Sequence, residues 1–317
     1  MKNSINLGEV ITAMVTPYKK DGSVDLDGAE LLASRLLKNG TDTLLLTGST
    51  GEDHQLTQAE KWAVVKRVRG YMPKEAKIMV STGDKTTMGA IQKTKTAFDL
   101  GADAVLISVP EYIKPPQQSI YIHFNAVAKA VPDKPIIIYN VPSRIGAEIM
   151  PETVAKLAHA NPNIIGIKQS MGNMDRVSEM KMLCPKGFQI YSGDDSLTLP
   201  MLALGAKGVI SVASHLEGTL IKKMIGSFKK GQVEQAEKIH HLLFPLFKSL
   251  FEMSNPMPIK EALYQKHMID TPVLRTLGRM PPKERGRLIQ SLRAFEEEKW
   301  DFLRTNNASV RTGGREI

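Results

Sequence analysis

Residues 164–170 have the sequence IIGIKQS, a short apolar run that leads into a lysine, Lys168. The run is rich in β-branched residues and is bounded by turn-forming residues, a pattern that predicts a buried strand of a parallel sheet. Because side chains alternate along a strand, Ile165 and Ile167 share one face and Lys168 lies on the other. If the strand belongs to a closed barrel, the two isoleucines pack beneath outer helices and Lys168 points into the mouth of the barrel.

A lysine at such a position has a chemical use. Desolvation disfavours the ammonium and lowers its pKa, and a partly neutral amine can attack a carbonyl to form a Schiff base. The alternative is a lysine at the end of a strand whose amine simply extends to water. The strand alone leaves both interpretations of Lys168 open.

The chain repeats a strand-then-helix pattern. The predicted strands are 9–16, 43–46, 77–80, 104–107, 135–139, 164–168, 188–191 and 208–212. Helical patterns separate nearly all of them, and the helix at 58–69 is preceded by a capping box of Thr57 and Glu60. Strands that alternate with helices in this number predict an α/β fold, a (β/α)8 TIM barrel.

The predicted barrel does not use the whole chain. Residues 1–218 contain the eight strands, and residues 219–304 predict three or four further helices that complete and extend the barrel. Residues 305–317 are polar and contain glycine, which predicts a disordered tail. We therefore expect one compact unit with a C-terminal helical extension.

Composition limits the class of protein. An apolar fraction of 42% and a charged fraction of 24% are typical of a globular protein with a sizeable core. A single cysteine, Cys184, excludes an intrachain disulfide, and the absence of a signal sequence or membrane-spanning run predicts a cytoplasmic protein. The net charge of +9 is spread along the chain without interleaved aromatic residues, so we expect neither a nucleic-acid nor a membrane partner.

Polar residues gather where the predicted strands end, which is where barrel enzymes carry their chemistry. These positions include Ser49, Thr50, Tyr112, Tyr139, Arg144, Lys168, Gly193 and Ile210. Tyr139 ends the strand before that of Lys168, so its hydroxyl is expected to reach the amine. The turn Gly48–Gly51 predicts a nest of amides for a carboxylate. The alternatives are a core tyrosine at 139 and ordinary turn chemistry at 48–51.

The acidic pair Asp194-Asp195 follows the seventh predicted strand. We interpret it as a helix cap rather than a metal site. The histidines show no ligand spacing, and no cofactor motif is present, so we expect neither a metal nor a cofactor.

Several ordered motifs carry a family resemblance over about 8–277. They are Gly48–Glu52 (GSTGE), Tyr139–Arg144 (YNVPSR), Gly166–Lys168 (GIK), Ser192–Asp195 (SGDD), Gly208–Ser211 (GVIS) and Asn255–Lys260 (NPMPIK). Together they resemble the dihydrodipicolinate synthase and N-acetylneuraminate lyase superfamily of pyruvate-dependent class I aldolases. The resemblance implies a Schiff-base carbon–carbon lyase, and it suggests a homo-oligomer, a dimer or dimer of dimers.

The resemblance implies catalytic roles for four residues. Lys168 is expected to form the Schiff base with pyruvate. Tyr139, Ser49 and Tyr112 are expected to form a proton relay, with Tyr112 supplied by a neighbouring subunit, and Tyr139 is expected to act as the general acid and base.

The resemblance also implies a substrate-binding set. Thr50 and the neighbouring amides are expected to hold the pyruvate carboxylate, and Gly193 and Ile210 belong to the same predicted set. In the synthase branch, the arginine of the YNVPSR motif grips the carboxylate of aspartate semialdehyde, and Arg144 stands at that position. Arg144 therefore favours the synthase branch.

Three residues depart from the synthase pattern. Ser49 stands where a threonine is usual, Ile145 replaces a threonine after the arginine, and Glu111 replaces the tyrosine that precedes the relay tyrosine. These departures leave open another pyruvate aldolase of the same superfamily, acting on a keto-deoxy sugar acid or N-acetylneuraminate.

Four further departures concern feedback by lysine. Lysine-inhibited bacterial synthases share an asparagine and a glutamate at the positions where this chain has Lys85 and Gly89. Histidines of the same lysine pocket are replaced by Gln58 and Lys61. We expect weak or absent inhibition by lysine.

The leading hypothesis is thus a lyase that condenses pyruvate with L-aspartate 4-semialdehyde to 4-hydroxy-tetrahydrodipicolinate in lysine biosynthesis. A barrel that binds a keto acid without turnover is the alternative from another class, and the presence of the lysine together with the whole relay disfavours it.

Overall fold

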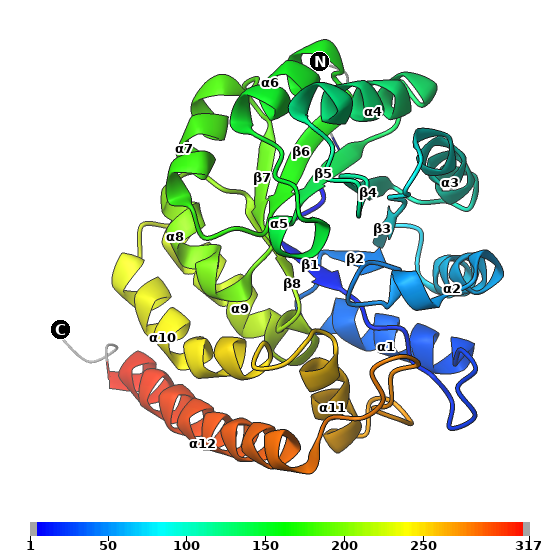
Figure 1. Cartoon of the computed structure of the whole chain (residues 1–317). Helices are drawn as coiled ribbons and strands as arrows, with labels where there is room; N and C mark the ends of the chain where they lie inside the picture. Colours follow the sequence, from blue (N-terminus) through cyan, green and yellow to red (C-terminus); the bar gives the residue numbers. More distant parts are fainter. Residues whose placement is uncertain (1–4, 313–317) are drawn as a thin grey trace.

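The computed structural model describes the backbone of residues 5–312 and the side chains of residues 5–305. Its strands form a closed parallel barrel in the order β1 to β8, surrounded by helices (Figure 1). The predicted α/β barrel is confirmed.

The strands are short and buried, as expected of strands covered on both faces. They are β1 (Val10–Ala13), β2 (Thr43–Leu46), β3 (Lys77–Ser81), β4 (Ala104–Ser108), β5 (Ile136–Asn140), β6 (Ile164–Gln169), β7 (Gln189–Ser192) and β8 (Gly208–Ser211). The first strand is shorter than the predicted 9–16, because the chain leaves the barrel before Pro17.

Helices follow the strands around the outside of the barrel. They are α1 (Leu26–Lys38), α2 (Gln58–Tyr71), α3 (Thr87–Asp99), α4 (Gln117–Ala130), α5 (Pro142–Ile145), α6 (Pro151–Ala160), α7 (Met174–Leu183), α8 (Thr198–Ala203), α9 (Ser214–Lys229), α10 (Val233–Ser249), α11 (Met257–Gln265) and α12 (Pro282–Thr312), with the 3-10 turns η1 (Asp53–Gln55) and η2 (Asp195–Leu197). The predicted capping box of α2 is confirmed: the Thr57 hydroxyl accepts the Glu60 amide, and the Glu60 carboxylate accepts the Thr57 amide.

Strand register decides which side chains meet inside the barrel. Tyr139 of β5 is the register partner of Lys168 in β6. The barrel closes where Ile11 of β1 pairs with Ile210 of β8. Ile167 is fully buried and Ile165 is half-buried, and β6 packs against the outer helix α6.

The helices after the barrel form a separate layer. Helices α10, α11 and α12 lie along one side of the molecule, α10 against α9 and α12 across α10 and α11 (Figure 1). The predicted boundary at 218/219 falls inside α9. The tail predicted at 305–317 begins within α12, whose helical backbone continues to Thr312, and residues 313–317 lie outside the described residues. Within the described part of the chain, no helix combines the length and apolar character needed to cross a bilayer.

Candidate active site

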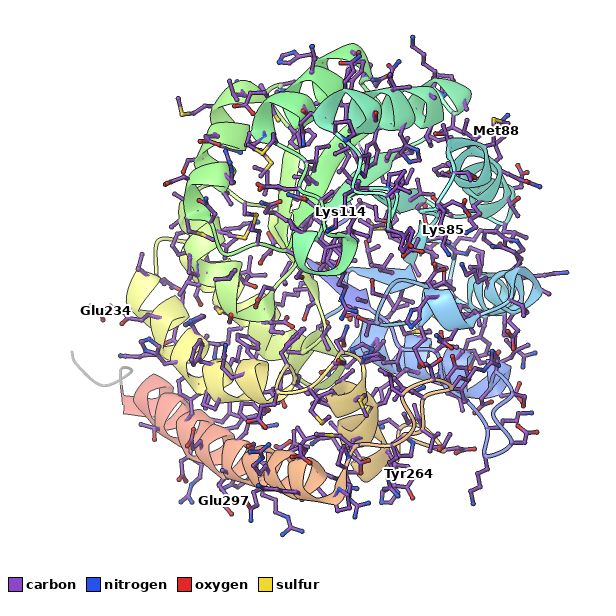
Figure 2. The ribbon with its side chains drawn as sticks, viewed as in Figure 1. Lys85, Met88, Lys114, Glu234, Tyr264 and Glu297 are labelled. Carbon is purple, nitrogen blue, oxygen red and sulfur yellow. The ribbon has the colours of Figure 1, made fainter. Side chains whose placement is uncertain are left out.

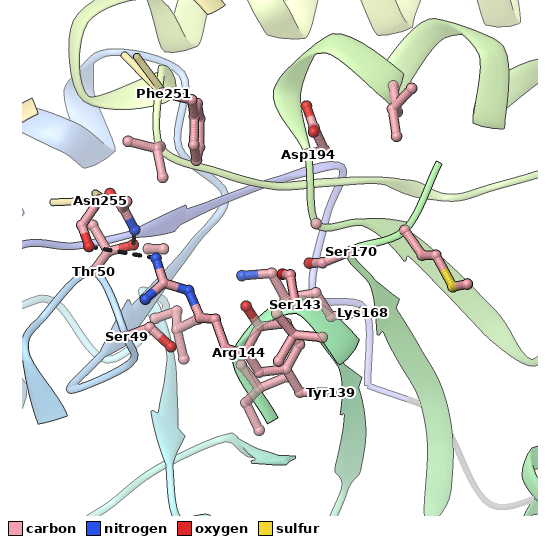
Figure 3. A pocket seen from close by; sticks show the side chains of 18 of the residues that line it. Ser49, Thr50, Tyr139, Ser143, Arg144, Lys168, Ser170, Asp194, Phe251 and Asn255 are labelled. Carbon is pink, nitrogen blue, oxygen red and sulfur yellow. Dashed lines mark hydrogen bonds between the residues drawn. The ribbon is translucent and has the colours of Figure 1, made fainter. Parts of the chain in front are cut away.

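A cavity of about 230 Å³ opens at the mouth of the barrel (Figure 3). Six of the eight predicted site residues line it: Ser49, Thr50, Tyr139, Arg144, Lys168 and Gly193. They come from the ends of several different strands, so the barrel brings together side chains that are far apart in the sequence.

Lys168 projects into this cavity from the end of β6 and is 7% exposed. Among the residues with described side chains, none accepts a hydrogen bond from its amine, and none forms an ion pair with it. Gly193 leaves room for it, because a Cβ there would lie 3.0 Å from Lys168 Cε. A buried amine without a partner is suited to nucleophilic attack on a carbonyl.

Tyr139 forms the wall next to the lysine. Its side chain is 8% exposed, and Lys168 Nζ lies 4.4 Å from the centre of its ring. The lysine thus rests on the ring face. Within the described part of the chain, the Tyr139 hydroxyl has no hydrogen-bond partner, unlike a core tyrosine satisfied at the rim. The hydroxyl is left free to exchange a proton with a bound molecule.

The turn after β2 supplies Ser49 and Thr50. Thr50 is 3% exposed, and its Oγ1 accepts a hydrogen bond of 2.9 Å from Asn255 Nδ2. Ser49 is half-buried. The segment after β1 anchors this turn, because the Thr16 hydroxyl donates a hydrogen bond of 2.6 Å to the Gly51 carbonyl.

Arg144 provides the positive charge of the cavity rim. It lies in the short helix α5, is exposed, and donates from Nη2 to the Asn255 carbonyl at 3.4 Å (Figure 3). A guanidinium held at one point and otherwise open to solvent is suited to gripping an incoming carboxylate.

Asn255 is the first residue of the NPMPIK motif, and the sequence alone predicted no role for it in the site. It lies just before α11 and contacts both Thr50 and Arg144. Ser143, Ser170, Asp194 and Phe251 also line the cavity without having been predicted. The NPMPIK motif was the sequence signal for Asn255.

Two predicted site residues lie outside the cavity lining. Tyr112 is 90% exposed in the loop before α4, with a left-handed backbone conformation of φ 76°. Ile210 is 1% exposed within β8, and Val212, two residues later, lines the cavity instead. Their roles stay predictions.

Asp194 caps the 3-10 turn η2, as predicted, whereas Asp195 lies inside that turn and binds the loop after β8. Asp194 accepts the Ser196 amide at the start of η2. Asp195 is buried and accepts the amides of Val212 and Ala213, both at 3.0 Å. Burial raises the pKa of the Asp195 carboxyl, and its hydrogen bonds oppose that change. Within residues 5–305, no cluster of three potential metal ligands is found.

A buried histidine ties the loops around the cavity together. His215 Nε2 accepts the Val15 amide at 3.1 Å, and Nδ1 donates to the Val212 carbonyl at 2.8 Å. This pattern requires the neutral ring, and burial lowers the pKa of His215 to about 4.

Lys61 and Lys85, two of the positions that differ from the lysine-inhibited synthases, form ion pairs with residues of this chain. Lys61 is 4% exposed and paired with Asp53. Lys85 lies at the surface, with Nζ 3.9 Å from Glu111 Oε1 (Figure 2). At Gly89, a Cβ would come within 2.3 Å of Asp84 Oδ1, so a larger residue there would require the Asp84 side chain to move.

Comparison with known proteins agrees with the geometry. Residues 6–294 match the model of the dihydrodipicolinate synthetase family. Two relatives named 4-hydroxy-tetrahydrodipicolinate synthase are similar: that of Nostoc punctiforme is 50% identical over 81% of this chain and 87% of its own length. That of Cyanothece sp. is 48% identical over the same shares.

Solved structures give the same result. Dihydrodipicolinate synthase from Cyanidioschyzon merolae, solved with lysine bound, is 40% identical with a TM-score of 0.89, covering 92% of this chain and 98% of that one. The Aquifex aeolicus enzyme is 40% identical with a TM-score of 0.88, covering 91% and 98%. The chain therefore belongs to the dihydrodipicolinate synthetase family.

Proposed function

We propose that this protein is a 4-hydroxy-tetrahydrodipicolinate synthase, a lyase that condenses pyruvate with L-aspartate 4-semialdehyde in lysine biosynthesis. The observation that carries the proposal is the unpartnered amine of Lys168, enclosed in a cavity of about 230 Å³ against the ring of Tyr139. The family match over nearly the whole chain supports it.

The first half of the reaction uses the amine. Lys168 Nζ attacks the keto carbon of pyruvate, a proton moves to the former carbonyl oxygen, and loss of water leaves an imine. Loss of a methyl proton then gives the enamine. The Tyr139 hydroxyl, free and beside the lysine, is the group we assign to these proton transfers, with Ser49 and Tyr112 as its relay.

The second half joins the two substrates. The enamine carbon bonds to the aldehyde carbon, and the aldehyde oxygen takes up a proton. The amino group of the aldehyde substrate then attacks the imine carbon, closes the ring and displaces the Lys168 amine. The protein regains its starting state, and the reaction needs no cofactor.

Two carboxylates have to be recognised. We assign the pyruvate carboxylate to Thr50 and the amides of its turn, with Gly193 and Ile210 near the same substrate. We assign the aldehyde carboxylate to Arg144 at the rim. Arg144 is exposed and bound through one contact of 3.4 Å, so it can turn toward a ligand entering from solvent.

Another pyruvate aldolase, acting on a keto-deoxy sugar acid or N-acetylneuraminate, is the second candidate. The hydroxyls of Ser49, Ser143 and Ser170 in the cavity lining favour it, because a polyhydroxylated aldehyde needs such partners. Ile145, in contrast, is 9% exposed and is not among the lining residues, so the loss of a threonine there leaves the cavity wall unaltered.

Two measurements test the function. Borohydride reduction with pyruvate should leave a stable adduct on a peptide containing Lys168, whereas a protein that only binds the keto acid gives none. A coupled assay with aspartate semialdehyde in competition with sugar-derived aldehydes should favour the semialdehyde. Preference for a sugar aldehyde would replace the synthase assignment and keep the Schiff-base chemistry.

We further propose that the enzyme works as a homo-oligomer, a dimer or dimer of dimers, in the cytoplasm. Tyr112 is 90% exposed and lies outside the cavity of its own chain, which supports its joining the relay from a second copy. Sedimentation of the protein together with the activity of Tyr112→Phe tests the assembly.

Burial raises the pKa of the Cys184 thiol to about 11, which is consistent with an unreactive cysteine.

A further inference from the structure

The turn that follows β2 is held in a conformation that its own residues disfavour. Thr47 and Glu52, at its two ends, both have left-handed backbone angles, φ 50° and φ 58°, although neither is glycine. Such conformations persist only where the surrounding structure imposes them. Thr50 lies between these two residues, so whatever holds them also sets the position of Thr50.

A buried ion pair holds the far end of the turn. Glu52 Oε1 lies 2.7 Å from Lys260 Nζ of α11, and the two side chains are 1% and 0% exposed. The same amine donates to the Thr16 carbonyl at 3.2 Å and lies 4.0 Å from the centre of the Tyr18 ring. Lys260 thus joins α11, the turn and the segment after β1 at one point.

A second contact joins the same two segments. Asn255, five residues before Lys260, donates to Thr50 Oγ1 at 2.9 Å. The approach to α11 therefore contacts the turn at Thr50 through a hydrogen bond and at Glu52 through an ion pair. A shift of α11 would move the turn at both points.

Stability is a poor explanation for this ion pair. Burial lowers the pKa of the Lys260 ammonium and raises that of the Glu52 carboxyl, and each charge opposes the change in the other. Replacing a buried pair by apolar groups is often neutral or stabilising, whereas its geometry fixes one arrangement of the chain. In addition, Glu52 Oε2 is buried without a hydrogen-bond partner among the described residues.

We propose that Lys260, through its ion pair with Glu52, is a positioning residue for the keto-acid carboxylate, holding the turn so that Thr50 and its amides face the substrate. This inference rests on the proposed function, because it assigns the pyruvate carboxylate to that turn. Lys260 itself is not among the described residues that line the cavity.

The test compares three variants of the full-length protein. Lys260→Met removes the ammonium, Glu52→Gln/Lys260→Met removes both charges, and Lys266→Met is the matched control. Lys266 is the C-cap residue of α11 and forms an ion pair of 2.6 Å with Glu296 of α12. KM for pyruvate, KM for the aldehyde and kcat are measured separately for each variant.

Both Lys260 variants should raise the KM for pyruvate by about tenfold or more while the KM for the aldehyde changes by less than about twofold. Borohydride trapping should slow at low pyruvate and recover when pyruvate is saturating. Lys266→Met should match the wild type in all of these measurements.

Unchanged pyruvate KM in a folded Lys260 variant overturns the inference, and so does an equal loss for both substrates. If Lys260→Met does not fold, the double variant, which leaves no unpaired buried charge, decides. If that variant also fails to fold, the pair serves the fold as a whole and the positioning role is rejected. Failure of the wild type to be trapped by pyruvate would instead overturn the proposed function.

Discussion

Lys168 and Tyr139 are register neighbours on β6 and β5, and the lysine amine lies 4.4 Å from the centre of the tyrosine ring. Backbone pairing between two parallel strands fixes this relationship, so it does not depend on a flexible loop. The ring covers one side of the amine and leaves the other side toward the cavity.

Lys168→Ala should abolish adduct formation with pyruvate, because no other lysine among the described residues lines the cavity. The matched control is Lys156→Ala, which also removes a lysine stacked on a tyrosine, 5.7 Å from the Tyr121 ring on the outer helices. Mass spectrometry after borohydride reduction measures both variants. An adduct that persists in Lys168→Ala would contradict the assignment of the nucleophile.

Tyr139→Phe should slow condensation by roughly a hundredfold or more while preserving the wall of the cavity, since only the proton-transfer group is lost. Tyr121→Phe provides the control for removing a tyrosine hydroxyl elsewhere in the barrel. Steady-state kcat is the measurement. Activity unchanged in Tyr139→Phe would remove the residue from the proton relay.

Arg144→Ala should chiefly raise the KM for the aldehyde, because the guanidinium lies exposed at the rim, on a helix separate from the turn assigned to pyruvate. Arg144→Lys keeps the charge and loses the planar fork, so its effect should be intermediate. Initial rates with each substrate varied in turn test this. A change confined to the KM for pyruvate would argue against the proposed role.

Lysine should bind weakly or not at all. Lys61 places an ammonium beside Asp53, Lys85 is a second positive charge at the positions compared with the lysine-inhibited synthases, and Gly89 supplies no carboxylate there. Isothermal calorimetry of this protein, with the Cyanidioschyzon merolae enzyme as the lysine-binding control, measures the affinity. Micromolar binding to this chain would refute the expectation.

Stability should fall in acid because of His215. Its pKa is about 4 in the folded protein against an ordinary 6.5, so between these values the unfolded chain binds a proton that the folded chain excludes. The free energy of unfolding is therefore highest above pH 6.5 and declines toward pH 4, by roughly 3 kcal/mol in total from this residue.

Urea unfolding at a series of pH values tests this sign. His215→Gln should flatten the acid slope by up to ~1.4 kcal/mol per pH unit. His241→Gln, on the exposed face of α10, should leave the slope unchanged. An identical slope in His215→Gln and the wild type would show that another group carries the dependence, with the buried His123, whose pKa is also lowered to about 4, the next to examine.

Local patterns predicted the barrel well, because each strand and helix carries its own periodicity and the strand ends locate the mouth. Lys168, Tyr139 and Thr50 were predicted on this basis. The role of Asn255 could not be predicted, because its contact with Thr50 spans 205 residues and depends on how α10 returns the chain to the barrel. Helical backbone beyond Thr305 was missed because polar, glycine-containing sequence resembles a tail, although α12 continues to Thr312.

The seam between β1 and β8 has a consequence for biosynthesis on the ribosome. The strand that bears the nucleophile is made well before Ile210 can meet Ile11 and close the ring, and Asn255 emerges later still. A nascent chain that ends after β6 carries the reactive amine before the part of the cavity that β7, β8 and Asn255 complete. Chemical competence therefore arises late in translation, after Asn255 has left the exit tunnel.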